Sequence, residues 1–209
     1  MADKPVGELI EEARARLIAA ERALRAAIGR MPDSPRRGRL IQERWQVWQM
    51  LGQDRFYASQ AGQDEYLDRV VFERKRGGVF VEIGAYDGVT GSNSLFFEAF
   101  RGWTGLLVEA SPTYHARAAA NRVTPCINVA VAETAGEVRF LDIRKGYTQM
   151  GGIVDWLGEV ARKAIEADPR TEAEEVVVPA RPLAEILAEA ELRRIDYLSI
   201  DIEGGELPV

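Results

Sequence analysis

The N-terminal part of the chain carries a helical pattern of apolar residues. From Val6 to Met31, apolar residues recur at alternating steps of three and four with charged residues between them, which is typical of an amphipathic helix. Pro32 and Pro35 interrupt this pattern, and a stretch rich in tryptophan and leucine then predicts a second helix. We therefore expect residues 1–55 to form an N-terminal α-helical extension. It is either a dimerisation or docking arm, or it packs against the chain's own domain.

After Gly78 the pattern changes to short apolar runs separated by helical stretches. This alternation is typical of βαβ units and of a parallel sheet buried on both faces. Residues 56–209 are therefore expected to form one α/β domain. The expected strands are residues 79–83, 105–109, 127–131, 137–143, 176–179 and 197–202, and the expected helices lie near residues 93–101, 112–121, 154–167 and 182–191.

Composition and charge exclude several classes of function. The chain has 209 residues, 46% of them hydrophobic and 29% charged, which is ordinary for a globular protein. Its formal net charge is −6 and it has no basic stripe, so it is not expected to bind nucleic acid. With one cysteine and one histidine, it is not expected to contain a disulfide framework, a histidine-based catalytic triad or a multi-histidine metal site.

The chain also lacks the sequence signals of secretion and membrane insertion. Its N-terminal residues have no basic segment followed by an apolar one, and no run of about 18 apolar residues occurs. We therefore expect a cytoplasmic protein without a membrane span.

The stretch VFVEIGAYDGVTGSNS, residues 79–94, is the strongest candidate for a binding site. Its apolar strand ends in Glu82, Gly84 and Gly88 follow, and Ser92 and Asn93 are good N-cap residues for a helix. Glycines let the backbone turn tightly and approach a ligand at the carboxyl end of a strand, where open α/β sheets bind their ligands. We call residues 82–94 the glycine turn and expect a ligand there.

The charges around the glycine turn indicate which ligand it suits. A dinucleotide-binding turn has the pattern G-x-G-x-x-G, but Tyr86 stands in place of its second glycine. Glu82 and Asp87 lie in a stretch, residues 79–99, that contains no lysine or arginine, so a diphosphate would meet negative charge. S-adenosyl-L-methionine carries a sulfonium and an ammonium against one carboxylate, and this charge favours it as the cofactor.

Glu109 ends the next expected strand, 21 residues after Gly88. An acid at this place accepts hydrogen bonds from ribose hydroxyls, and NAD-binding folds carry one there too. Glu109 therefore indicates a nucleoside without choosing the cofactor. The structural alternative is that Glu82 and Glu109 only cap the ends of their strands.

Four stretches, in the same order along the chain, resemble the FkbM family of S-adenosylmethionine-dependent methyltransferases. They are SQAGQDEYL at residues 59–67, the glycine turn with its strand, GLLVEASP at residues 105–112 and IDYLSIDIEGGE at residues 195–206. The resemblance spans roughly residues 59–209 and leaves residues 1–55 outside. It implies a Rossmann-like class I methyltransferase sheet, S-adenosyl-L-methionine as cofactor, and O-methylation of a hydroxyl on a small-molecule, sugar or glycan acceptor.

The resemblance also implies roles for individual residues. The methionine end of the cofactor is expected at Glu82, Gly84 and Gly88, its ribose at Glu109, and its methyl group near Asp201. The full set of expected cofactor contacts is Glu82, Gly84, Ala85, Tyr86, Asp87, Gly88, Ser92, Asn93, Glu109, Ala110 and Asp201. Gln63 and Asp64 are expected near the pocket, or else they cap a helix through residues 65–72.

Asp201 and Glu203 are the expected catalytic residues. They lie two apart on an expected strand, so their side chains share one face. Asp201 is expected to take the proton of the acceptor hydroxyl or to contact the cofactor. Glu203 acts with it, or is stabilised at the amino end of a following helix. No third oxygen ligand is fixed by the spacing, so no metal is expected.

A glycine-containing segment, GYTQMGGIVDWL at residues 146–157, is expected either to cover the pocket or to be an ordinary connection. In the first case Tyr147 and Gln149 contact the acceptor.

The expected domain ends directly after the fourth core strand, so the sheet is expected to lack its C-terminal part and to expose the strand at residues 197–202 as an apolar edge. A homo-oligomer would form through this edge or through the N-terminal helix. Two alternative functions remain at this point, a non-catalytic scaffold that retains the methyltransferase fold and, less favoured by Tyr86, a nicotinamide-linked oxidoreductase.

Overall fold

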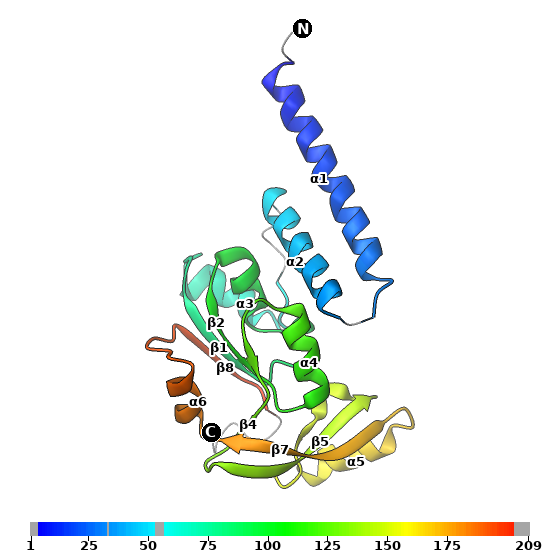
Figure 1. Ribbon diagram of the computed structural model, residues 1–209, viewed down its shortest axis with the longest axis vertical. Helices are drawn as coiled ribbons and strands as arrows, with labels where there is room; N and C mark the ends of the chain where they lie inside the picture. The colour runs from blue at the N-terminus through cyan, green and yellow to red at the C-terminus, as the bar shows by residue number, and fades with distance from the viewer. Residues whose placement is uncertain (1–3, 33, 53–56, 203–209) are drawn as a thin grey trace.

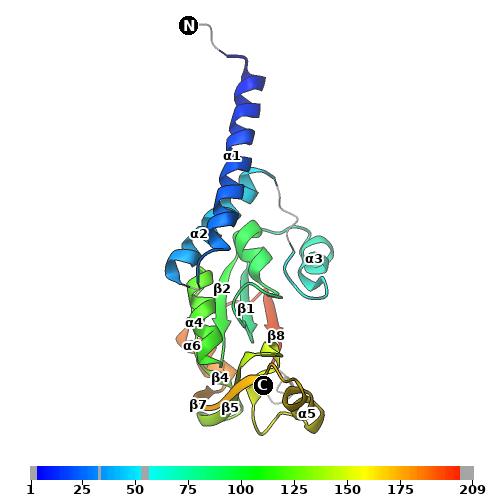
Figure 2. The ribbon, with the colours of Figure 1, turned by 90° about the vertical axis from the view of Figure 1, so that its right-hand side faces the viewer.

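The computed structural model describes residues 4–32, 34–52 and 57–202 (Figures 1 and 2). It begins with a helical hairpin of α1 (Val6–Ile28) and α2 (Pro35–Met50), as the apolar pattern predicted. Pro35 opens α2 because the first turn of a helix needs no N–H from it, and the Oγ of Ser34 accepts a hydrogen bond from the Arg37 amide at 3.2 Å. The expected domain boundary at residue 55 lies outside the described residues.

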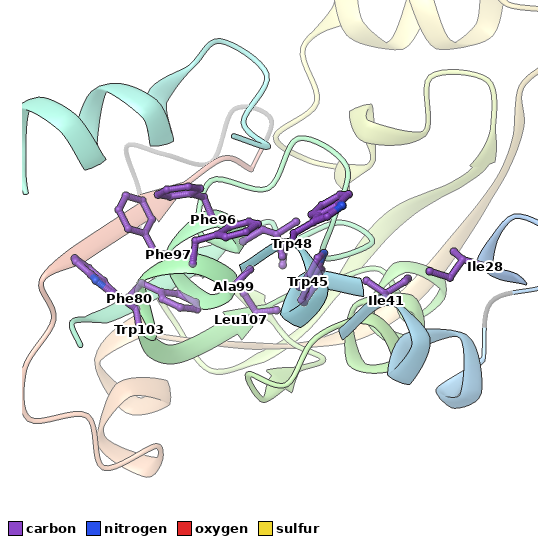
Figure 3. Packing of buried hydrophobic residues seen from close by; sticks show 13 residues of the cluster. Ile28, Ile41, Trp45, Trp48, Phe80, Phe96, Phe97, Ala99, Trp103 and Leu107 are labelled. Atoms are coloured by element: carbon purple, nitrogen blue, oxygen red, sulfur yellow. The ribbon is translucent and has the colours of Figure 1, made fainter. Parts of the chain in front are cut away.

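The second helix of the hairpin belongs to the main hydrophobic core. Trp45 and Trp48 are buried in one cluster with Phe97 and other aromatic residues of the α/β part (Figure 3). Gly38 lies so close to the end of α4 (Pro112–Asn121) that a Cβ there would be 1.3 Å from the Ala120 carbonyl oxygen. The N-terminal half of α1 projects beyond α2 in both views. The chain therefore packs α2 against its own domain.

The first sheet is parallel and carries the expected βαβ arrangement. It consists of β1 (Val79–Ile83), β2 (Thr104–Val108), β3 (Cys126–Ile127) and β8 (Tyr197–Ile200) in the order β3-β2-β1-β8. The π-helix η2 (Phe97–Arg101), α4 and α6 (Leu183–Glu189) lie in the connections. Strand β1 is almost entirely buried because it has neighbours on both sides. Within the described residues β8 is an edge strand, and Leu198 on it is 42% exposed.

A second sheet differs from the sequence prediction. Its order is β4-β7-β5-β6, with β4 (Ala130–Val131), β5 (Gly136–Lys145), β6 (Gly152–Ile153) and β7 (Glu172–Arg181). Strand β5 is antiparallel to both β6 and β7. The single strand expected at residues 127–131 is divided between β3 of the first sheet and β4 of the second. Only residues 146–151 connect β5 to its neighbour β6, which is too short for the crossover that parallel neighbours need.

The remaining elements follow the prediction with local shifts. The helix expected near residues 154–167 begins only at α5 (Glu159–Ala167), because the Trp156 and Leu157 amides donate to the Ile153 carbonyl and form a turn. The expected helix through residues 65–72 is α3 (Gln63–Tyr66) continued by the π-helix η1 (Leu67–Val71). A short 3-10 helix, η3 (Thr148–Met150), precedes β6. In the described part of the chain, no helix is both long and apolar enough to cross a membrane.

Candidate functional site

A cavity of about 250 Å³ lies at the carboxyl ends of β1, β2 and β8. Residues of β4, β5 and β6 close its other side, so the second sheet supplies a wall of the cavity. Open α/β sheets bind ligands at the carboxyl ends of their parallel strands. The volume is close to the lower end of the range of small-molecule sites, about 300–1,000 Å³.

The wall of the cavity is acidic. Among the described residues that line it are four carboxylates, and none is a lysine, arginine or histidine. The carboxylates are Glu82, Glu109, Asp142 and Asp201. Since charges in a low-dielectric cleft act strongly on a ligand, this wall favours a cation over an anion.

Glu82, at the end of β1, is hydrogen-bonded to the segment that follows the glycine turn. Its Oε2 accepts hydrogen bonds from the Ser92 hydroxyl at 2.9 Å and the Ser94 hydroxyl at 2.5 Å. Its Oε1 accepts one from the Asn93 amide at 2.7 Å. The carboxylate thereby satisfies groups at the start of the helical segment that leads into η2.

Arg122, directly after α4, lies buried beneath the glycine turn. Its guanidinium donates to the Gly88 carbonyl at 2.9 Å, to the Ser94 hydroxyl at 3.1 Å and to the Glu98 carboxylate at 3.1 Å. It also lies 3.8 Å from the Glu82 carboxylate. The sequence reasoning that the acids near the turn lack a basic neighbour is therefore wrong for Glu82. The cavity wall itself has no basic side chain among the described residues, because Arg122 does not line it.

The glycines of the turn allow close approaches within the protein. Gly84 has φ +82°, and a Cβ there would lie 1.9 Å from the Asp201 carbonyl oxygen. Gly88 has φ +77°, and its added Cβ would lie 2.8 Å from the Arg122 side chain. Between them Tyr86 takes a left-handed φ of 50°, which is unusual for a residue with a side chain. Such strained residues cluster at binding sites.

Glu109, at the end of β2, fixes this strained residue. Its Oε2 accepts a hydrogen bond from the Tyr86 amide at 2.7 Å and its Oε1 one from the Ser111 amide at 2.8 Å. Burial raises the pKa of Glu109 to about 7, although these two amides act in the opposite direction, and the neighbouring Asp142 raises it further. Asp142 itself accepts hydrogen bonds from the hydroxyls of Ser111 at 2.5 Å and Thr113 at 2.7 Å.

Asn93 lines the cavity and carries an unpaired buried atom. Its Nδ2 donates to the Ser199 hydroxyl on β8 at 3.0 Å. Its Oδ1 is buried and has no hydrogen-bond partner. Buried polar atoms of native proteins are nearly always paired, so this one calls for a ligand or water as its partner.

Residues 148–153 of the segment expected to cover the pocket form part of its wall, whereas Tyr147 does not, and contact with an acceptor stays a prediction. Thr148 Oγ1 lies 2.7 Å from the Tyr86 hydroxyl, and Gln149 Oε1 accepts a hydrogen bond from Gln60 Nε2 at 3.1 Å. Thr148, Gln149 and the residues up to Ile153 line the cavity. This segment therefore connects to both the glycine turn and the segment before α3.

A family model described as the methyltransferase FkbM domain matches residues 82–209. The match begins at Glu82, the first acid of the cavity wall, and includes the glycine turn, β2 and β8. The chain belongs to the FkbM methyltransferase family. Comparisons with curated proteins and with solved structures return no match. A methyltransferase domain implies a methyl donor and an acceptor, whereas α1 and α2 lie outside the matched residues.

The FkbM domain gathers most of the sequence-predicted site residues around one cavity. Those in its wall are Glu82, Gly84, Ala85, Tyr86, Ser92, Asn93, Glu109, Ala110, Gln149 and Asp201. Five others lie outside the wall, namely Asp87, Gly88, Gln63, Asp64 and Tyr147. Glu203 lies outside the described residues. Contact of any of these with a ligand stays a prediction.

Two of the residues outside the wall, Asp87 and Asp64, have structural partners. Asp87 Oδ1 accepts hydrogen bonds from the amides of Val89 and Thr90, which shapes the turn. Asp64 is fully buried and accepts hydrogen bonds from the amides of Ala58 and Ser59. Asp64 therefore holds the segment before α3 and does not act as its N-cap, which is Gly62 without a side-chain cap.

Sequence reasoning missed several residues of the wall, among them Gln60, Tyr114, Asp142 and Thr148. Asp142 had a local signal, because it is an acid inside the apolar run FLDI of β5 and its side chain is 1% exposed. Gln60 and Thr148 lie in stretches that the sequence singled out, residues 59–67 and 146–157, but no signal marked these two residues within them. They reach the cavity only through the fold.

Proposed function

We propose that this protein is an S-adenosylmethionine-dependent methyltransferase that methylates a hydroxyl of a small-molecule or glycan acceptor. The observation that carries the proposal is the acidity of the cavity wall, which has Glu82, Asp142 and Asp201 besides Glu109, whose pKa is about 7, and no basic side chain among the described residues. S-adenosylmethionine has a net positive charge and suits this wall by Coulomb attraction. The diphosphate of a nicotinamide cofactor would be repelled.

The described residues fit this cofactor in a further respect. Glu109 uses one lone pair on each oxygen for Tyr86 and Ser111, and a carboxylate has about four such sites, so it can still accept from ribose hydroxyls. We therefore propose that Glu109 holds the ribose and that Asn93 and Asp201, which also line the cavity, lie around the methionine end.

When bound, S-adenosylmethionine supplies a methyl group activated by its positively charged sulfur. The chain's own residues position the acceptor and take its proton. Asp201 directly follows β8, and its amide donates to the Ile83 carbonyl at 3.0 Å, which fixes this backbone at the end of β1. We propose that the Asp201 carboxylate accepts the hydroxyl proton of the acceptor, as a general base does.

Titration calorimetry with S-adenosylhomocysteine tests the proposal. The wild-type chain is expected to bind it, and Glu109→Ala is expected to weaken binding about tenfold or more, as the loss of hydrogen bonds to a charged group does. Glu137→Ala is the matched control because Glu137 is exposed on β5, away from the cavity wall. Absence of both heat and thermal protection at millimolar ligand would refute the proposal and favour the non-catalytic scaffold.

A further inference from the structure

Gln60 and Gln149 form a hydrogen-bonded pair at the rim of the cavity. Gln60 Nε2 donates to Gln149 Oε1 at 3.1 Å, and both residues line the cavity while being exposed to solvent. A residue that lines a cavity and also reaches solvent lies at its opening. Gln60 belongs to the segment before α3 and Gln149 to η3, so the pair joins two distant parts of the chain across this opening. We call Gln60 and Gln149 the rim pair.

The glycine turn holds Gln60 from one side. Ser59, directly before it, forms a parallel β-bridge with Gly91. A Cβ on Gly91 would lie 2.9 Å from Cγ of Gln60, so the Gln60 side chain lies directly against the backbone of the turn. The absence of a side chain at Gly91 therefore gives Gln60 the space that it occupies.

Asp64 holds the same segment from the other side. Its fully buried carboxylate accepts hydrogen bonds from the amides of Ala58 at 2.6 Å and Ser59 at 3.2 Å, and from the Ser59 hydroxyl at 2.5 Å. Hydrogen bonds to a charged acceptor are about twice as strong as neutral ones. Asp64 does not line the cavity, and it lies outside the residues that the family model matches, as Gln60 does. Its contacts fix the residue directly before the rim pair.

The size of the cavity requires the rim to move during ligand exchange. Its volume of about 250 Å³ is below the range of about 300–1,000 Å³ that small-molecule sites have, and such sites enclose most of their ligand. The contact between Gln60 and Gln149 joins exposed neutral groups, and a hydrogen bond of this kind contributes little net stability. The rim pair can therefore break and form again without unfolding of the domain.

We propose that the rim pair is a gate for ligand exchange and that Asp64 is the positioning residue that keeps this gate closed. The inference rests on the proposed function, since the ligand is its cofactor, and adds to it the control of entry and release. Asp64 acts through Ser59, because it places Gln60 where the two side-chain amides meet. A gate joins protein groups to each other, so opening it changes the rates of exchange in both directions and leaves the affinity nearly unchanged.

Stopped-flow mixing with S-adenosylhomocysteine measures both rate constants. Tryptophan fluorescence follows the reaction, because Trp156 lines the cavity. Gln60→Ala and Gln149→Ala are each expected to raise the association and dissociation rate constants about three- to tenfold, the effect of one neutral hydrogen bond. The dissociation constant should change less than about twofold. The double variant should exchange no faster than either single one, because both substitutions remove the same bond.

Asp64→Asn tests the positioning role. It keeps the size of the side chain and one of two acceptor oxygens, and it is expected to raise both rate constants about two- to fivefold. In the Gln60→Ala background it should raise them no further, whereas a residue that only supports the fold would act equally in both backgrounds. Should Asp64→Asn fail to fold, Ser59→Ala takes its place, because it removes the hydroxyl that donates to Asp64.

Asp196→Asn is the matched control. Asp196 also accepts a hydrogen bond from a backbone amide, that of Val79 at 2.9 Å, but it does not line the cavity. Its substitution is expected to lower the free energy of unfolding and to leave both rate constants unchanged.

The outcomes separate the gate from the proposed function. Unchanged rate constants in Gln60→Ala and Gln149→Ala would overturn the gate, and so would weaker binding with an unchanged association rate constant. An effect of Asp64→Asn that persists in full in the Gln60→Ala background would overturn the positioning role. In each of these cases the wild-type chain still binds S-adenosylhomocysteine, so the proposed function stands. A wild-type chain that gives no binding in calorimetry would overturn the proposed function itself.

Discussion

Glu109 gives the protein a pH-dependent stability that can be measured without a ligand. Burial raises the pKa of its carboxyl group from 4.5 to about 7, against the hydrogen bonds from Ser111 and Tyr86. The unfolded chain releases this proton near pH 4.5, whereas the folded chain holds it up to about pH 7. The stability that protonated Glu109 contributes is therefore full below pH 4.5 and is lost as the pH rises through 7.

The magnitude follows from the two pKa values. A separation of about 2.5 between them corresponds to about 3 kcal/mol in the free energy of unfolding. Between pH 5 and pH 8 the wild-type chain should lose about 2–3 kcal/mol of this contribution. Glu109→Gln keeps the size of the side chain and removes the titration, so the variant should not lose it. Solvent screens the charge of Glu109 only weakly because the residue is only 7% exposed.

Urea-induced unfolding at several pH values between 5 and 8, followed by circular dichroism, measures the effect. The quantity of interest is the free energy of unfolding of the wild type minus that of Glu109→Gln, because other titrating groups cancel in this difference. It should fall by about 2–3 kcal/mol from pH 5 to pH 8. Glu137→Gln, exposed on β5, should follow the wild type. Parallel profiles for the wild type and Glu109→Gln would refute the reasoning.

Three further predictions test the turn and the wall. Gly84→Ala is expected to weaken S-adenosylhomocysteine binding about tenfold, because the new Cβ would overlap the Asp201 carbonyl oxygen. Gly62→Ala, at φ +80° with no atom within 4 Å, should leave the affinity unchanged. Equal affinities of the two variants in calorimetry would contradict this. Gln149→Ala should raise the ligand's dissociation rate several-fold in stopped-flow experiments, because Gln149 lines the cavity. The control is Tyr147→Ala, which should leave the rate unchanged because Tyr147 is exposed and lies outside the wall. Arg122→Met should lower the free energy of unfolding by about 3–5 kcal/mol, because it leaves the buried Glu82 and Glu98 without their basic partner. Arg122→Lys should recover part of this stability, and a loss below about 1 kcal/mol in Arg122→Met would argue against the reasoning.

The parallel sheet was predictable because its strands are continuous apolar runs. Strand β1 begins and ends where the pattern predicted, and the expected strand at residues 105–109 differs from β2 by one residue at each end. The second sheet was not predictable in the same way. Which strand pairs with which depends on contacts distant in sequence, and a local pattern does not record them. The alternation of exposed Val177 and buried Val178 in β7 is the local sign of a sheet covered on one face, but a run of three valines hides it.

The candidate site was predictable only where it lies within one stretch of chain. Glu82, Tyr86 and Asn93 come from one motif and reach the cavity together. Asp142 and Gln60 come from β5 and from the segment before α3, and only the fold brings them to the same wall. A motif therefore identifies one side of such a cavity, and the opposite side must come from the structure.

The glycine turn has a different physical meaning in the structure from the one that its sequence suggested. Glu82 is hydrogen-bonded to the segment that follows it, Gly84 lies against the Asp201 backbone, and Gly88 lies against Arg122. Because these three residues join the turn to its neighbours, substitutions there should lower stability and ligand binding together. The recognisable motif thus builds the turn, whereas the attraction for a cation depends on the acidic side chains that several elements bring to the cavity wall.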